Sequence, residues 1–195
     1  KPLDNIAMIG AGFMGAGIAQ VSAVDGINVL LKDVKEDMLA SAKQTIWKDL
    51  EKKLKRKTMR QPEAEEIINR VESKLDYSGF DKVSVVIEAV FEEIKLKQKI
   101  VADVEAVVKP DTIFASNTSA LPISHIAEKA SRPEHIIGMH YFSPVPKMPL
   151  LEIIKTPKTA DWVTATCFEL GIRQGKTCIV VNDGPGFYTT RILAP

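Results

Sequence analysis

The sequence of 195 residues predicts an α/β fold with a doubly wound, mostly parallel sheet. Three observations lead to this prediction. Short apolar segments alternate with segments of helical periodicity, which is typical of a parallel sheet. One apolar segment, residues 83–90 (VSVVIEAV), is nearly continuous, as expected for a strand covered on both faces. A glycine-rich turn also joins the first apolar segment directly to a helix.

The first part of the chain predicts two strands and a long helical excursion. Apolar strands are expected at Asn5–Gly10 and Ile27–Asp33, with a helix of small residues between them. A long amphipathic helix should begin at Lys35, because apolar residues recur there at helical spacing: Met38, Leu39, Ala42, Ile46, Leu50 and Leu54. The Gln-Pro pair at 61–62 should break it, and Glu63–Val71 predicts another helical pass. We expect this excursion to project from the sheet.

The rest of the chain continues the alternation. We expect strands at residues 83–90, 112–116, 136–142, 150–155 and 176–182, and helices at 93–109, 123–130 and 161–170. Prolines at 144, 146 and 149 should stiffen the loop before the strand at 150–155. Pro185 can open a last helix that is unfinished at Pro195. The expected organisation is one domain over residues 1–184, followed at 185–195 by the start of a linker helix to a further domain.

The composition argues against several classes of protein. With 45% apolar and 26% charged residues, the chain is in the range of folded globular domains. Lys and Arg number 26 against 25 Asp and Glu, so a formal charge of +1 provides no overall field that would recruit nucleic acid. The apolar stretches are far shorter than the ~20 residues that span a bilayer. The first residue is Lys1, and we expect an excised piece whose targeting peptide lies outside it.

Cysteine and histidine usage gives no sign of a disulfide framework or a metal. Cys167 and Cys178 form no CxxC motif, so we expect two reduced thiols. His125, His135 and His140 have no ligand spacing, whereas a zinc site needs three or four converging ligands. No metal is therefore expected.

The glycine-rich turn carries the motif GxGxxG at Gly10, Gly12 and Gly15. It follows a strand, opens a helix and has an acidic residue, Asp33, about 20 positions later, which is the context of a Rossmann dinucleotide site. Asp33 would accept hydrogen bonds from the ribose hydroxyls and repel a 2′-phosphate, and the neighbouring Lys32 is not an Arg, so NAD is favoured over NADP. The alternative is a glycine turn that only packs against the sheet.

His140 is the candidate general base. It lies near the carboxyl end of a predicted strand, where ligands gather in open parallel sheets. Glu152 follows twelve residues later in the adjoining strand, from which its carboxylate could orient the imidazole. Such a histidine can take a hydroxyl proton while a hydride leaves. A structural histidine and a surface carboxylate remain the alternatives.

Two further segments each have a functional and a structural interpretation. Ser116, Asn117, Thr118 and Ser119 follow an apolar strand and could hold a carbonyl or a nicotinamide, or could cap the helix at 123–130. The basic run KDLEKKLKRK on the long helix could be a solvated face or a contact for the phosphates of a large anionic substrate.

Seven features occur in order along the chain: GAGFMGAGIAQ, Asp33, IEAVFEEIKLK, ASNTSALPI, GMHYFSPV, LLEII and DGPGF. Together they resemble the L-3-hydroxyacyl-coenzyme A (CoA) dehydrogenase family over essentially the whole chain. The resemblance implies NAD-dependent oxidation of an L-3-hydroxyacyl-CoA to the 3-ketoacyl-CoA in fatty-acid β-oxidation. The segments ASNTSALPIS, IGMHYFSPV and DGPGFYTTR most resemble a branch of the family that acts on long-chain acyl substrates as part of a multifunctional mitochondrial protein.

That branch implies neighbours for this domain. A hydratase domain would precede it, a helical domain would follow it, and a thiolase-type β subunit would bind the parent chain. The implied location is the mitochondrial matrix, with association of the parent with the inner membrane. No nucleic acid is implied.

The resemblance also assigns roles to residues. It makes His140 the general base, Glu152 its partner, and Ser119 a contact between the substrate hydroxyl and the nicotinamide, with Asn117 in the same loop. The glycine turn and a second segment would contact the cofactor through Phe13, Met14, Ala89, Val90, Phe91, Glu92 and Lys97. Lys55 or Arg56 would meet the phosphates of CoA.

Two positions depart from the single-function members, which have Asn where this chain has Ser143 and Thr190. A hydroxyl replaces an amide only in part, so a substrate contact by either residue is in doubt. Two other functions are considered: a non-catalytic NAD-binding or structural protein on the same fold, and a dehydrogenase for a small hydroxy acid without CoA.

Overall fold

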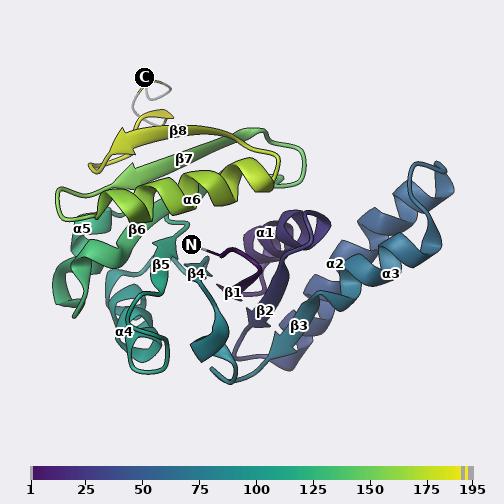
Figure 1. Ribbon diagram of the computed structural model, residues 1–195, viewed down its shortest axis with the longest axis horizontal. Helices are drawn as coiled ribbons and strands as arrows, with labels where there is room; N and C mark the ends of the chain where they lie inside the picture. Colours follow the sequence, from purple (N-terminus) through teal and green to yellow (C-terminus); the bar gives the residue numbers. More distant parts are fainter. Residues whose placement is uncertain (1, 190–191, 193–195) are drawn as a thin grey trace.

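The computed structural model describes residues 2–189 and 192, and it confirms the doubly wound α/β architecture (Figure 1). One eight-stranded sheet has the order β3-β2-β1-β4-β5-β6-β7-β8. The strands are β1 (Asn5–Ile9), β2 (Asn28–Lys32), β3 (Val71–Lys74), β4 (Val85–Glu88), β5 (Ile113–Ser116), β6 (Ile136–Tyr141), β7 (Leu150–Lys155) and β8 (Thr177–Asn182). All neighbouring pairs are parallel except β6 and β7, which are antiparallel.

Helices cover both faces of the sheet, because each face is apolar. They are α1 (Phe13–Val24), α2 (Glu36–Lys55), α3 (Gln61–Asn69), α4 (Ile94–Glu105), α5 (Ile123–Ile126) and α6 (Asp161–Arg173), with single 3₁₀ turns at Phe80–Lys82, Ala127–Lys129 and Pro133–His135. One core cluster joins the sheet to α1, α2, α3 and α6. The other joins it to α4 and α5. The chain therefore buries two apolar layers around one sheet.

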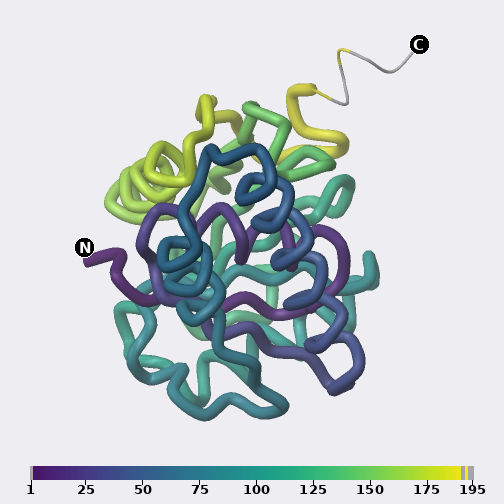
Figure 2. Tube along the Cα trace, turned by 90° about the vertical axis from the view of Figure 1, so that its right-hand side faces the viewer, coloured from purple at the N-terminus to yellow at the C-terminus, as the bar shows by residue number. Residues whose placement is uncertain are grey.

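The α2–α3 pair projects from the body of the domain, as expected (Figure 1), and it lies in front of the rest of the domain in Figure 2. The prediction of its break was wrong in detail. The first helix already ends at Lys55, Lys57 takes a left-handed conformation (φ 57°), and α3 begins at Gln61 with Pro62 in its first turn. Proline is favoured there because its missing N–H has no helical partner to lose.

Three other expectations are corrected. Val71 does not end a helix but begins β3, a four-residue edge strand that the sequence analysis missed. The helix expected at 123–130 is a single α turn followed by a 3₁₀ turn. The last helix does not open at Pro185, because residues 184–188 form a bend and turns and helical conformation begins only at Thr189. Among the described residues, no helix is long and apolar enough to cross a membrane.

The strand order reverses between β1 and β4, and this creates the place for a ligand. The chain leaves β1 towards β2 on one side, and β4 lies on the other side. In open α/β sheets, ligands bind at such a switch point, beyond the carboxyl ends of the strands. The glycine turn follows β1, and the loops after β4, β5 and β6 leave the same edge.

Candidate active site

The glycine turn has the geometry of a pyrophosphate cradle. Gly10 is left-handed (φ +99°), and a Cβ added there would lie 2.6 Å from the carbonyl oxygen of Ala89. A Cβ on Gly15 would lie 1.8 Å from the Gly10 oxygen, so only glycine lets α1 approach β1 this closely. At Gly12, by contrast, a Cβ would meet nothing within 4 Å. Gly12 is the N-cap of α1 and makes no side-chain hydrogen bond to it, so the first amides of the helix are left for an anion to bind.

Asp33 is fixed beside this turn. Its Oδ2 accepts a hydrogen bond from the Ala11 amide at 2.8 Å, and its Oδ1 accepts one from the Lys35 amide at 3.1 Å. These bonds tie the end of β2 to the loop after β1 and leave the carboxylate half-buried at the rim. This is the position from which an acid can bind ribose hydroxyls, so the residues present fit a dinucleotide.

A buried ion pair supports the edge of the sheet after β4. Glu88, the last residue of β4, and Lys97, in α4, both have side chains with no exposed surface, and their charged atoms lie 2.8 and 2.9 Å apart. The Glu88 carboxylate also accepts hydrogen bonds from the Val90 amide and the Ser116 hydroxyl. The sequence analysis did not identify Glu88 as a site residue, because it is a single acidic residue within the apolar strand segment VSVVIEAV.

Glu92 lies above this pair and holds the polar loop after β5. Its carboxylate accepts hydrogen bonds from the Thr118 hydroxyl and from the amides of Ser119 and Ala120, and it lies 3.4 Å from Lys97. Partial burial raises the pKa of Glu92, but the Thr118 bond and the Lys97 charge outweigh burial and hold that pKa below its usual value. Lys97 is thus enclosed below the carboxyl ends of the parallel strands, where it pairs with Glu88 and Glu92.

The polar loop after β5 does not cap the following helix. The first two amides of α5, at Ile123 and Ser124, instead donate to the two carboxylate oxygens of Asp183, both at 2.8 Å. Asn117 accepts a hydrogen bond from the Tyr141 amide at 2.9 Å, which joins this loop to β6. Ser119 is exposed at the mouth of the cavity described below. The capping alternative is therefore wrong.

His140 and Glu152 form the predicted pair. They are directly opposite one another in the antiparallel register of β6 and β7, and His140 Nδ1 lies 2.6 Å from Glu152 Oε2. Glu152 has no exposed surface and His140 has 7%. Burial raises the pKa of Glu152, but hydrogen bonds from His140 and from the amide and hydroxyl of Thr189 outweigh it, so the pKa stays below its usual value. An ionised Glu152 leaves His140 Nε2 as the nitrogen for proton transfer.

A hollow of about 380 Å³ opens next to His140. Its walls include predicted site residues from four segments: Met14, Ala89, Val90, Glu92, Asn117, Ser119, His140 and Ser143. Phe13 and Phe91 are exposed outside it, at 63% and 87%. Lys55 and Arg56 are exposed at the end of α2, away from these walls. Thr190 lies outside the described residues.

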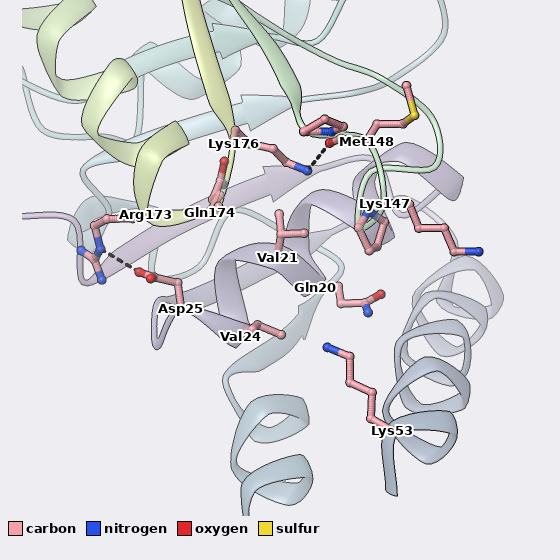
Figure 3. Close-up of a pocket in the computed structure, with 13 residues that line it drawn as sticks. Gln20, Val21, Val24, Asp25, Lys53, Lys147, Met148, Arg173, Gln174 and Lys176 are labelled. Carbon is pink, nitrogen blue, oxygen red and sulfur yellow. Dashed lines mark hydrogen bonds and ion pairs between the residues drawn. The ribbon is translucent and has the colours of Figure 1, made fainter. Parts of the chain in front are cut away.

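A second cavity, of about 390 Å³, lies between α1, α2 and the loop before β7 (Figure 3). Lys53 extends from α2 towards α1 in this view, and Lys147, Arg173 and Lys176 add three more cations. Asp25 is the one acid in its lining, and it pairs with Arg173 at 2.8 Å. The cavity is therefore strongly cationic.

Lys176 holds the loop that separates the two cavities. Its ammonium donates to the carbonyl oxygens of Val145 and Met148, the latter at 2.8 Å, and burial lowers its pKa. The same loop begins with Ser143, which lines the hollow beside His140. Among the described residues, no group of His, Cys, Asp and Glu is arranged to hold a metal ion.

Three features meet at this edge of the sheet: the glycine turn before the uncapped helix α1, the Asp33 carboxylate after β2, and the His140–Glu152 pair. Together they define a dehydrogenase domain that binds NAD. Residues 5–184 match the family described as "3-hydroxyacyl-CoA dehydrogenase, NAD binding domain". The chain belongs to this family, and its cofactor is NAD.

Two curated proteins are similar to this chain over almost its whole length. The fatty acid oxidation complex subunit alpha of Idiomarina loihiensis is 54% identical over 99% of this chain, and that of Vibrio vulnificus is 48% identical over 97%. The chain spans 27% of the length of each. The crystal structure of (S)-3-hydroxybutyryl-CoA dehydrogenase PaaH1 from Ralstonia eutropha has a TM-score of 0.95 and 34% identity, covering 98% of this chain and 68% of that one.

Proposed function

We propose that this domain oxidises L-3-hydroxyacyl-CoA thioesters to 3-ketoacyl-CoA with NAD. The observation that carries the proposal is the His140–Glu152 pair, which opens onto a cavity next to the glycine turn. Family membership alone supplies the fold and the cofactor, whereas chemistry needs a base in the right place.

His140 acts as the general base. The substrate hydroxyl donates its proton to Nε2, because Nδ1 is already bound to Glu152. Glu152 fixes the tautomer and stabilises the imidazolium that forms, and it stays ionised throughout. The glycine turn and Asp33 would hold NAD, which would supply the hydride acceptor for the oxidation at C3 of the substrate. In the reverse direction, the imidazolium returns the proton to the 3-keto oxygen.

Ser119 and Asn117 orient the reacting groups. Both line the cavity with His140, and the hydrogen bonds to Glu92 and Tyr141 hold their loop in place. We assign Ser119 to the substrate hydroxyl and nicotinamide, with Asn117 beside it. Ser143 lines the same wall, so its hydroxyl contributes a weaker contact than an amide would at that position.

The phosphates of CoA are assigned to one face of α2. Arg56 and Lys53 are three residues apart, so they lie on the same side of the helix, and Lys53 lines the cationic cavity of Figure 3. Lys55 lies on a different side. Ser143 and Pro146, which line the two cavities, are also three residues apart, and at most about 11 Å of backbone separates them. A flexible pantetheine arm can bridge such a distance.

For the parent chain, we propose long-chain substrates and a place in fatty-acid β-oxidation. The relatives named above are alpha subunits almost four times as long, which supports a multidomain parent. The proposed neighbours are a hydratase domain before this one, a helical domain after it and a thiolase-type β subunit. The amino-acid sequences of the motifs favour the alpha subunit of the mitochondrial trifunctional protein and a matrix location. The two relatives named above are instead bacterial. Fractionation of the source cells, with an antibody to this domain, tests the location.

The decisive experiment measures NADH oxidation driven by a 3-ketoacyl-CoA, with the parent chain and its His140→Gln variant. We expect turnover in the wild type and a loss of at least about a hundredfold in the variant, with NADH affinity nearly unchanged. Equal loss of turnover and NADH affinity would remove His140 from its role. NADH binding without wild-type turnover would favour the non-catalytic alternative. Faster turnover of free 3-keto acids than of their CoA thioesters would favour a small-acid dehydrogenase.

A further inference from the structure

Glu152 has a second partner that the sequence analysis missed. Its Oε1 accepts hydrogen bonds from both the amide and the hydroxyl of Thr189, each at 2.8 Å, while Oε2 binds His140. Both oxygens of a fully buried carboxylate are thus engaged, and of the two Thr189 bonds only the hydroxyl bond can be removed by a side-chain change.

Thr189 directly follows a turn that is anchored at several points. At the start of the turn, Asp183 binds the first amides of α5. In the middle, Gly186 and Phe187 are both left-handed, with φ of 70° and 47°. Phe187 is 2% exposed, and its ring centroid lies 5.7 Å from that of His140. A bulky residue keeps a left-handed backbone only where its surroundings hold it there, so packing on His140 and the Thr189 bonds fix this turn.

We propose that residues 183–189 form a clamp on the His140–Glu152 pair and that Thr189 is a positioning residue for the base. This inference rests on the proposed function. The Thr189 hydroxyl draws charge from Oε1 and so limits how strongly Glu152 attracts the proton of His140. It also holds the carboxylate in the plane that the imidazole needs.

Loss of this hydroxyl has a definite direction. Without it, more negative charge remains on Glu152, and the protonated form of the neighbouring imidazole is favoured over the neutral form. Turnover in the oxidation direction requires neutral His140, so the acid limb of its pH profile moves to higher pH. The other titratable groups on the surrounding elements are Glu92 and Tyr141 on the cavity wall, the enclosed Glu88–Lys97 pair, Asp183, Tyr188, Lys155 on β7, and Lys176, which holds the loop after β6. The substitution leaves all of them in place.

The test compares Thr189→Val with Thr189→Ser in the parent chain. Thr189→Val should lower kcat about threefold to tenfold and raise the apparent pKa of the acid limb by about half to one unit, with KM and NADH affinity changed less than about twofold. Thr189→Ser, which keeps the hydroxyl, should restore both. Thr164→Val is the matched control, because the buried Thr164 hydroxyl has no hydrogen-bond partner in the described part of the chain.

Titration of the His140 imidazole by NMR gives a readout that needs no turnover. A rise in its pKa in Thr189→Val but not in Thr189→Ser supports the clamp. An unmoved limb and imidazole pKa, or equal effects of Val and Ser, overturns it. If His140→Gln retains turnover, the proposed function fails instead, whatever Thr189 does.

Discussion

The Lys97 ammonium contacts both carboxylate oxygens of Glu88, at 2.8 and 2.9 Å, where neither side chain reaches solvent. A buried ion pair of this kind contributes little net stability, but the loss of one partner leaves the other charge uncompensated. The pair lies under the loops that carry Ser119 and Glu92.

We therefore expect Lys97→Met to lower the free energy of unfolding by about 3–5 kcal/mol. Denaturant unfolding measures the change. The double variant Glu88→Gln/Lys97→Met should lose less than the sum of the two single variants, because it also removes the buried Glu88 charge that Lys97→Met alone would leave unpaired. Strict additivity would show that the two charges do not interact.

Two glycines of the turn have different roles: Gly15 is needed for folding, and Gly12 is needed for cofactor binding. Gly12→Ala should fold normally, because a Cβ there meets nothing within 4 Å and the backbone is extended (φ −69°, ψ −172°). Its methyl group would occupy the space of the pyrophosphate, so NADH affinity should fall at least about tenfold. Gly15→Ala should instead lower the melting temperature, since its Cβ would collide with the Gly10 oxygen at 1.8 Å. Thermal unfolding and fluorescence titration with NADH distinguish the two, and similar behaviour of both variants would contradict this division.

Asp33 should determine the choice between the two dinucleotides. Asp33→Ala removes an acceptor for the ribose hydroxyls, so we expect NADH affinity to fall about tenfold to a hundredfold. NADPH affinity should rise or stay constant, because the repulsion of a 2′-phosphate is lost. Titration of both cofactors measures the ratio, with the exposed Asp4→Ala as a control at the opposite edge of the sheet. An unchanged ratio would take Asp33 out of the ribose site.

The assignment of CoA phosphates to α2 can be tested with a truncated substrate. Lys53→Met and Arg56→Met should each raise KM for a 3-ketoacyl-CoA about threefold to tenfold. Neither should change KM for the N-acetylcysteamine thioester, which has no phosphate. Lys52→Met is the control, because Lys52 pairs with Asp49 on the exposed helix surface. Equal effects on both thioesters would mean that the variants act through structure.

Elements with strong periodicity could be predicted from the sequence, and short polar ones could not. The α2 helix has six apolar residues at helical spacing, and its core positions are buried as expected. β3 reads Val-Glu-Ser-Lys and buries only Val71, so nothing distinguishes it from the end of a helix. An edge strand with one partner needs little apolar surface, and tertiary pairing decides its state.

The candidate site shows the same division. The His140–Glu152 pair could be predicted, because both residues lie in apolar strands joined by a proline-rich loop. Thr189 and Asp183 could not, since their partners are 37 and 60 residues away and ordinary turn residues carry no long-range signal. Lys97 was assigned to the cofactor by resemblance alone, and its contacts with Glu88 appear only in three dimensions.

The reversed direction of β7 determines how this protein can tolerate insertions. In a fully parallel sheet, neighbouring strands are joined by a crossover of a dozen or more residues, so a base and its acid would be distant in sequence. Here the chain turns back after β6, and Glu152 faces His140 within a single hairpin-like connection. A one-residue insertion inside either strand would rotate one of the two side chains to the opposite face of the sheet. The spacing of residues within each of the two strands is therefore fixed by the His140–Glu152 pair.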